Sequence, residues 1–297
     1  MKLGITLPNS WGVDTPDQAV DVGILAEDRG FDSVWVMDHL LNIGFVRERL
    51  EGRPYWHSLA TLTALSVQTS KVLLGTSVLV LPYHDPVEIA KYVATLDHFS
   101  RGRVVLGVGA GGLESEFRAL GIPTSQRGRL TDESIKVMRE LWTSDEPSYE
   151  GARWDFTGAL FSPKPYQGRR LPIWVGGSSP GAKRRAARLG DAWHPNAGSP
   201  SAFAEQAEGM RALAEQNGRD PGSLQMTFRL SVDASRHSSG WRPSVGGSES
   251  AAEVTELLNH YREVGVEHLV LALDFGDLEA ITDVVEFIAS EIKPHLD

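Results

Sequence analysis

The sequence contains no cysteine, which excludes disulfide bonds, thiolate metal ligands and a cysteine nucleophile. It has no apolar run of the length that a bilayer requires, and its opening residues, MKLGITLPNS, indicate a strand and not a signal peptide. Positive charge is scarce, since 29 lysines and arginines stand against 39 acidic residues for a net charge of −10. These absences predict a cytoplasmic protein with no membrane partner and no nucleic-acid partner.

Several catalytic signatures are also missing. The sequence has no HExxH, no nucleophile elbow and no Walker lysine. Asp38-His39 fits the start of a metal site, but no further ligands follow at a suitable spacing, so we predict no metal. Glycoside hydrolysis needs two inward-facing acids, and Asp38 with Glu114 or Glu116 is the available pair. The polar residues suit a redox cofactor better than hydrolysis.

Short apolar runs alternate with segments of helical period along the whole chain. Eight such units predict an α/β fold, a TIM (β/α)8 barrel, with 1–297 as a single domain. The predicted strands are Leu3–Leu7, Ser33–Met37, Val72–Leu81, Val104–Val108, Ile173–Val175, Ala192–Trp193, Leu224–Val232 and His268–Leu273.

Insertions are predicted after strands 2, 4 and 7, at Leu40–Tyr55, Thr143–Gln167 and Ala234–Ser250. The second has aromatic residues around Gly151, as in a hairpin. The third is rich in serine and glycine, and its length fits either a mobile lid or a disordered loop.

In this fold, chemistry gathers on the loops that follow the carboxyl ends of the strands. This rule selects Asn9, Trp11, Asp38, His39, Tyr83, His84, Gly109–Glu116, Gly176–Ser179, His194 and Asn196. Gly107-x-Gly109-x-x-Gly112 fits the dinucleotide fingerprint, but that motif belongs on a first strand, and three strand–helix units precede this one. We therefore expect the glycines to clear space at the barrel mouth, where a flat ring or a phosphate lies against bare backbone.

Two more segments place glycines or small residues at a predicted strand. Pro172–Pro180 places glycines between a strand and a helix, an arrangement that favours an anion at the helix N-terminus over an ordinary turn. The same helix carries Lys183, Arg184, Arg185 and Arg188, which fit either a solvated face or recognition of a polyanionic tail. Gly75–Val78 interrupts the third strand with small residues, as a bulge does.

Five motifs in order resemble the bacterial luciferase-like family of oxidoreductases, in particular its branch that uses the deazaflavin coenzyme F420. They are V-W-V-M-D-H at Val34–His39, L-G-T-S-V at Leu74–Val78, L-G-V-G-A-G at Leu106–Gly111, R-G-R-x-x-x-E at Arg127–Glu133 and W-V-G-G-S-S at Trp174–Ser179. The resemblance runs from Met1 to about Asn196 and more loosely beyond.

The resemblance implies roles for particular residues. Asp38 and His39 lie beside the cofactor ring. We expect His39 to be the proton donor or acceptor for the substrate, because the pKa of an ordinary histidine lies near working pH; the alternative is that His39 only braces the loop through Asp38. A non-prolyl cis bulge at Ser77-Val78 backs the ring. The implied cofactor-binding residues are Thr76, Ser77, Val78, Gly109, Ala110, Gly111, Ser115, Gly176, Gly177, Ser178 and His194. Arg127 and Glu133 are interpreted as a structural arginine–carboxylate lattice.

The predicted function is hydride transfer between F420 and a small-molecule substrate, by a homodimer. The basic helix favours the deazaflavin, with its anionic tail, over FMN. The alternatives are an FMN-dependent monooxygenase that uses O2, and a non-catalytic flavin-binding protein. In related sugar-phosphate dehydrogenases a glutamate follows the strand-4 glycines, and here that position is Gly112. Sugar-phosphate oxidation is therefore not expected.

Overall fold

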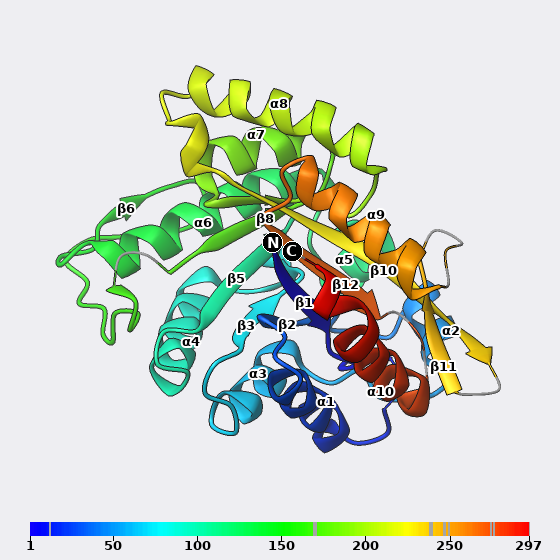
Figure 1. Ribbon diagram of the computed structural model, residues 1–297. Helices are drawn as coiled ribbons and strands as arrows, with labels where there is room; N and C mark the ends of the chain where they lie inside the picture. The colour runs from blue at the N-terminus through cyan, green and yellow to red at the C-terminus, as the bar shows by residue number, and fades with distance from the viewer. Residues whose placement is uncertain are drawn as a thin grey trace.

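The protein is described by a computed structural model that covers residues 1–11, 13–168, 171–237, 240–245, 248, 250–273, 275 and 277–296. Parallel strands close into an eight-stranded barrel in the order β1, β2, β3, β5, β8, β9, β10 and β12, with β12 pairing back onto β1 (Figure 1). Their bounds are Lys2–Thr6, Ser33–Val36, Leu73–Thr76, Val104–Gly109, Ile173–Gly176, Ala192–His194, Gln225–His237 and His268–Leu273. The predicted TIM barrel is confirmed.

Helices surround the barrel (Figure 1). They are α1 Pro16–Asp28, α2 Phe45–Leu50, α3 Ser58–Ser66, α4 Pro86–Phe99, α5 Glu114–Ala119, α6 Arg127–Thr143, α7 Pro180–Leu189, α8 Pro200–Gln216, α9 Ala251–Glu263 and α10 Leu278–Phe287. Four of them begin at a proline. Proline suits the first helical position, because an N–H group there has no acceptor within the helix and its absence costs no hydrogen bond. Within the described ranges, none combines the length and apolar character that a bilayer crossing requires.

Two strand predictions differ from the structure. The third strand is not continuous: β3 ends at Thr76, and a separate β4 (Leu79–Val80) pairs with β5. The seventh strand does not stop at Val232, because β10 continues to His237 and pairs antiparallel with β11 (Gly240–Ser244). The third insertion is thus largely a hairpin where we expected a lid or a disordered loop, and residues 238, 239, 246, 247 and 249 of it lie outside the described residues.

The hairpin expected around Gly151 is present as β6 (Tyr149–Glu150) and β7 (Asp155–Phe156), which pair antiparallel. Glu133 of α6 accepts hydrogen bonds at Oε1 from the backbone N–H groups of Arg153 and Trp154, at 2.9 and 3.4 Å. Glu133 therefore holds this hairpin, and the expected lattice between Glu133 and Arg127 is not formed.

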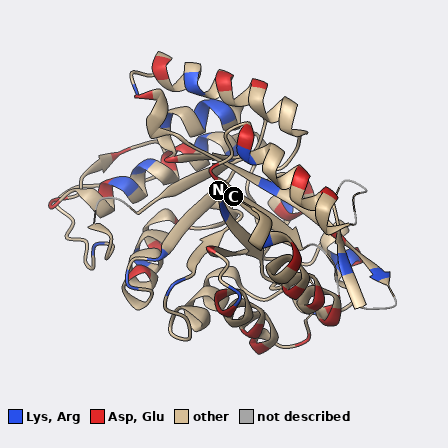
Figure 2. Cartoon of the chain, viewed as in Figure 1, with Lys and Arg blue, Asp and Glu red and all other residues tan. Residues whose placement is uncertain are grey.

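The barrel interior is filled by aromatic side chains. Trp35 and Trp174 stack with ring centroids 4.6 Å apart, and Val105, Ala192 and Val270 complete this small cluster. A much larger apolar core lies between the barrel and its helices. Acidic residues lie along the outer helices, α1 and α10 among them, while α7 carries a dense group of basic ones (Figure 2).

Candidate functional site

A cleft of about 480 Å³ opens at the carboxyl ends of the barrel strands. It is lined by Met37, Ser77, Val78, Gly109, Ala110, Gly111, Arg127, Gly176, Gly177, Ser178, Ser179, Ala182, Arg185, His194, Asn196 and Arg229. Nine of the expected cofactor-binding residues therefore lie around one space, although their segments are far apart in the sequence. Thr76, Ser115, Asp38 and His39 are not part of this lining.

The bulge between β3 and β4 forms one wall of the cleft. The Ser77–Val78 peptide bond is cis, as the family resemblance implied. The hydroxyl of Thr76 donates to the carbonyl of Gly107 at 2.6 Å and ties the bulge to β5. Thr76 thus supports the wall from behind.

The glycines of β5 and β8 make room for Val78. A Cβ on Gly109 would lie 2.6 Å from Val78 Cγ2, and a Cβ on Gly176 would lie 2.8 Å from Val78 Cγ1. A Cβ on Gly107 would lie 1.8 Å from the carbonyl oxygen of Thr76. We expected these glycines to expose bare backbone to a ligand. They instead admit the bulge, and Val78 offers an apolar surface to the cleft.

A buried chain of hydrogen bonds fixes the Ser77 hydroxyl. The Thr227 hydroxyl donates to the carbonyl of Trp193 at 3.0 Å, so it accepts from His194 Nδ1–H at 2.8 Å. His194 Nε2 then accepts from the Ser77 hydroxyl at 2.9 Å. Burial, followed by the charge of Arg229, lowers the pKa of His194 to about 3. The imidazole is therefore neutral at ordinary pH, and Ser77 presents oxygen lone pairs to the cleft.

The far end of the cleft is the start of α7. Gly177 has a φ of +107°, which favours glycine, and Ser179 caps the helix by accepting from Ala182 N–H at 3.2 Å. The Ser178 hydroxyl is buried and has no hydrogen-bond partner among the described residues. Buried hydroxyls are normally bonded, and a helix N-terminus favours anions, so this end has the chemistry of a phosphate site.

Only one member of the predicted basic cluster lines the cleft. Arg185 is buried, pairs with Asp132 and donates to the Gly128 carbonyl at 2.9 Å. Two other arginines of the lining, Arg127 and Arg229, were not assigned to the site from sequence. The signal available for Arg229 was that it is the one charged residue of the predicted strand Leu224–Val232.

Asp38 is engaged on both of its oxygens. It is 4% exposed; Oδ2 accepts from Val80 N–H at 3.0 Å and lies 2.8 Å from His84 Nε2. Oδ1 accepts from the Ser58 hydroxyl at 3.3 Å. Asp38 therefore joins β2, β4 and α3, and this geometry suits a supporting role better than proton transfer.

His39 pairs with Glu116 and not with Asp38. Its Nδ1 lies 2.6 Å from Glu116 Oε2, while Oε1 accepts from Leu40 N–H at 2.7 Å and Leu41 N–H at 3.0 Å. Burial opposes ionisation of Glu116, but these hydrogen bonds outweigh it and lower its pKa. The alternative in which His39 braces its loop through Asp38 does not hold.

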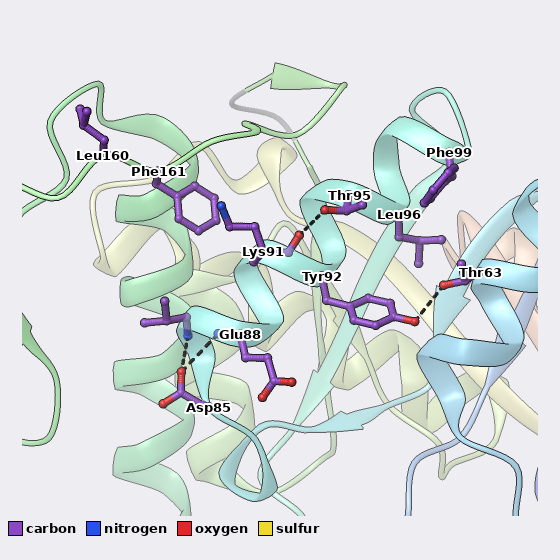
Figure 3. A pocket seen from close by; sticks show the side chains of 11 residues that line it. Thr63, Asp85, Glu88, Lys91, Tyr92, Thr95, Leu96, Phe99, Leu160 and Phe161 are labelled. Carbon is purple, nitrogen blue, oxygen red and sulfur yellow. Dashed lines mark hydrogen bonds between the residues drawn. The ribbon is translucent and has the colours of Figure 1, made fainter.

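A hollow larger than this cleft lies elsewhere, on the outer face of α4. It measures about 830 Å³ and is mostly apolar. Figure 3 shows Phe161 beside Lys91 of α4, with the Lys91 ammonium 4.5 Å from the Phe161 ring centroid, and Leu160 farther out on the same segment. It lacks the converging strand ends of the cleft, and the N-terminus of α4 beside it is already capped by the Asp85 carboxylate, so we assign no chemistry to it.

A sequence model of the luciferase-like monooxygenase family matches residues 1–239. An F420-dependent glucose-6-phosphate dehydrogenase of Microbacterium testaceum is 35% identical over 204 residues, or 64% of this chain and 56% of its own length. One of Nakamurella multipartita is 34% identical over 230 residues, or 74% and 65%. The chain thus spans about half to two thirds of these relatives.

A solved structure, an F420-dependent secondary alcohol dehydrogenase in complex with an F420-acetone adduct, superposes with a TM-score of 0.80. The alignment covers 100% of this chain and 99% of that one at 21% identity, so it supports the fold alone.

Proposed function

The chain belongs to the luciferase-like monooxygenase family, and from this premise we propose that it transfers a hydride between coenzyme F420 and a small organic substrate. The observation that carries the proposal is the cleft, which joins the apolar surface of Val78 to an anion site at α7. The names of the most similar relatives, which are F420-dependent, favour the deazaflavin.

The residues of the cleft fit such a coenzyme. Val78 would support the flat ring, and the Ser77 hydroxyl would accept a hydrogen bond from it. The Ser178 hydroxyl, which has no partner among the described residues, and the N-terminus of α7 would bind a phosphate. Arg127 and Arg229 would add positive charge along the cleft. When bound, the coenzyme supplies or accepts the hydride, and the protein supplies position and charge.

His39 is the proposed group for proton transfer. Because the Glu116 carboxylate accepts from Nδ1–H, the neutral imidazole keeps Nε2 as a proton acceptor. In the direction of alcohol oxidation, Nε2 would take the hydroxyl proton as the hydride leaves the carbon, and Glu116 would stabilise the imidazolium formed. In the reverse direction the imidazolium would return that proton to a carbonyl oxygen.

We propose a substrate other than a sugar phosphate, even though the two relatives are glucose-6-phosphate dehydrogenases. Gly112 occupies the position of the expected glutamate and has open space around it. The Glu114 side chain is 76% exposed, 3.9 Å from Arg118, and Glu116 is committed to His39. No carboxylate of this segment is therefore free to replace the missing glutamate.

Parallel fluorescence titrations with F420 and FMN test the proposal. Micromolar or tighter binding of F420 with much weaker FMN binding is expected, followed by turnover of the bound coenzyme with simple alcohols or ketones. Preference for FMN would move the protein to the oxygen-using monooxygenases. Binding without turnover by any substrate would favour a flavin-binding protein.

We further propose a homodimer formed through the apolar hollow on α4, which we name the α4 groove. Its rim exposes Leu160 by 88% and Phe99 by 54%, and large exposed apolar side chains gathered at one place are typical of interfaces. Glu88 and Lys91 give this rim both signs of charge, so it can meet a second copy of itself across a two-fold axis.

The proposal treats 1–297 as a single domain, since β1 and β12 from opposite ends of the sequence pair in one barrel. It includes a cytoplasmic location, because a dissociable coenzyme has to be regenerated by other enzymes of the same compartment.

A further inference from the structure

A second cavity lies at the opposite, amino-terminal end of the barrel. It measures about 490 Å³ and is lined where β1, β3, β5, β8, β10 and β12 begin. Chemistry in this fold belongs to the other end, so the proposed hydride transfer makes no use of this cavity.

The proton of His268, which lines this cavity, can be placed from its hydrogen bonds. Trp35 Nε1–H donates to the Ser33 hydroxyl at 2.7 Å, and that hydroxyl lies 2.6 Å from His268 Nε2. The Ser33 proton has no other acceptor among the described residues, so Ser33 donates and Nε2 accepts. Burial, followed by the charge of Lys2, lowers the pKa of His268 to about 3. The ring is neutral, and its one proton is on Nδ1.

Two N–H donors that line the cavity therefore have no acceptor among the described residues, and each belongs to a ring that is nearly buried. His268 is 1% exposed and Trp174 is 3% exposed, and their rings meet edge to face at 5.0 Å. Neither His268 Nδ1–H nor Trp174 Nε1–H is hydrogen-bonded to any residue that the structure describes. Both N–H groups are open to the cavity and can bond an acceptor there, and two donors on neighbouring rings of one cavity favour a ligand that carries two acceptor oxygens.

The charges around the cavity favour an anion. Lys2 and Arg139 line it, and Asp191 is the acidic residue of the lining. Asp191 already pairs with Arg139 and accepts from Ile173 N–H at 2.7 Å, so Lys2 leaves an excess of positive charge. The remaining walls include Leu73, Val104 and Val105, which suit an apolar body.

We propose that this cavity binds the carboxylate of a small organic acid. One carboxylate oxygen accepts from Trp174 Nε1–H and the other from His268 Nδ1–H, with Lys2 balancing the charge. The apolar part of the acid lies against the walls formed by β3 and β5. The site is separate from the coenzyme cleft and does not depend on the function proposed for it.

Benzoate is a suitable probe. Titration of the full chain, followed by 1H–15N spectra of its eight tryptophan indoles, should shift the Trp174 Nε1–H signal downfield with millimolar or tighter affinity. Trp174→Phe assigns that signal, keeps the ring stack and removes the donor. By calorimetry it should weaken benzoate binding about tenfold, the effect of one lost charge-assisted hydrogen bond.

Trp11→Phe is the matched control and should leave benzoate binding unchanged. Trp11 Nε1–H likewise has no partner among the described residues, but it lies outside this cavity. Lys2→Gln should weaken binding while leaving the fold intact, because its side chain is exposed. Unchanged affinity in both Trp174→Phe and Lys2→Gln would overturn the proposal. So would binding of inorganic phosphate but not of benzoate, because the apolar walls would then have no role.

Discussion

His39 and Glu116 are held 2.6 Å apart, Nδ1 to Oε2, by segments that lie 77 residues from each other in the sequence. The neighbouring Asp38 binds His84 instead. Asp38 and His39, which follow the end of β2, therefore belong to two separate pairs. Consecutive side chains of an extended backbone point to opposite sides, so the two residues reach different partners. The first pair contains the group that we propose for proton transfer, and the second joins β2 to β4.

Replacement of Glu116 tests the first pair. Glu116→Gln should lower kcat about 100-fold, within the range of general acid–base catalysis, because a neutral amide cannot stabilise the imidazolium of His39. Steady-state kinetics measures this loss. Glu114→Gln, at a side chain 76% exposed, is the control, and equal losses in the two variants would contradict the assignment.

The fit of Val78 against the glycines can be tested with one methyl group. Gly109→Ala should cost about 1–3 kcal/mol of unfolding free energy, because its Cβ would lie 2.6 Å from Val78 Cγ2. It should also weaken F420 binding by displacing the ring support. Gly112→Ala has nothing within 4 Å of its new Cβ and should do neither. Urea denaturation of both variants measures the unfolding free energy, and titration with F420 measures the affinity for the coenzyme.

The orientation of the Ser77 hydroxyl depends on Thr227. Thr227→Val removes the acceptor of His194 Nδ1–H, so the ring proton should move to Nε2 and Ser77 should donate into the cleft. Long-range 1H–15N spectra would record this change of tautomer, and F420 affinity should fall about tenfold. Thr227→Ser keeps the hydroxyl and should restore both. Persistence of the Nδ1–H form in the valine variant would refute this assignment.

Acid should destabilise the protein well above the range in which carboxylates titrate. The pKa values of His194 and His268 are lowered to about 3 in the fold, while an unfolded histidine titrates near 6.5. Between these values the unfolded chain binds two more protons, so stability falls as pH falls, by about 2.7 kcal/mol per pH unit. Urea denaturation between pH 5 and 6 measures the slope, and His268→Asn should halve it. An unchanged slope would mean that His268 is not buried in its neutral form.

Disruption of the α4 groove tests the dimer. Phe99→Asp places a charge in the apolar interface and should convert the protein to a monomer, as measured by light scattering on a sizing column. Phe45→Asp changes a phenylalanine of similar exposure, 51% against 54%, at the start of α2 and should leave the mass unchanged. A wild-type protein of monomer mass would contradict the proposal directly.

The barrel could be predicted from sequence because its signals are local. Apolar runs and segments of helical period alternate strictly, which predicts eight strand–helix units. The position of the barrel mouth then follows from the fold. The break between β3 and β4 was visible as Gly75–Val78, but not which residues pack around it. That arrangement depends on contacts between strands, such as Gly176 against Val78, which no local pattern encodes.

The pairing of side chains at the barrel mouth could not be predicted from the sequence either. Asp38 and His39 were both recognised, yet their partners His84 and Glu116 come from other strand ends, and sequence spacing does not determine which acid meets which histidine. Arg127 was interpreted as structural because a helical arginine usually needs no further role. Its place in the cleft lining becomes visible only once α6 is packed against α4 and α7.

The packing around Val78 also has a consequence for how relatives of this chain can diverge. Gly109 and Gly176 are constrained by the two methyl groups of Val78, whereas Gly107 is constrained by the backbone of Thr76. A lineage that acquires a smaller residue at position 78 would therefore be free to accept alanine at 109 and 176, but not at 107. Positions 78, 109 and 176 should vary together as one evolutionary unit, with 107 the last glycine to be lost.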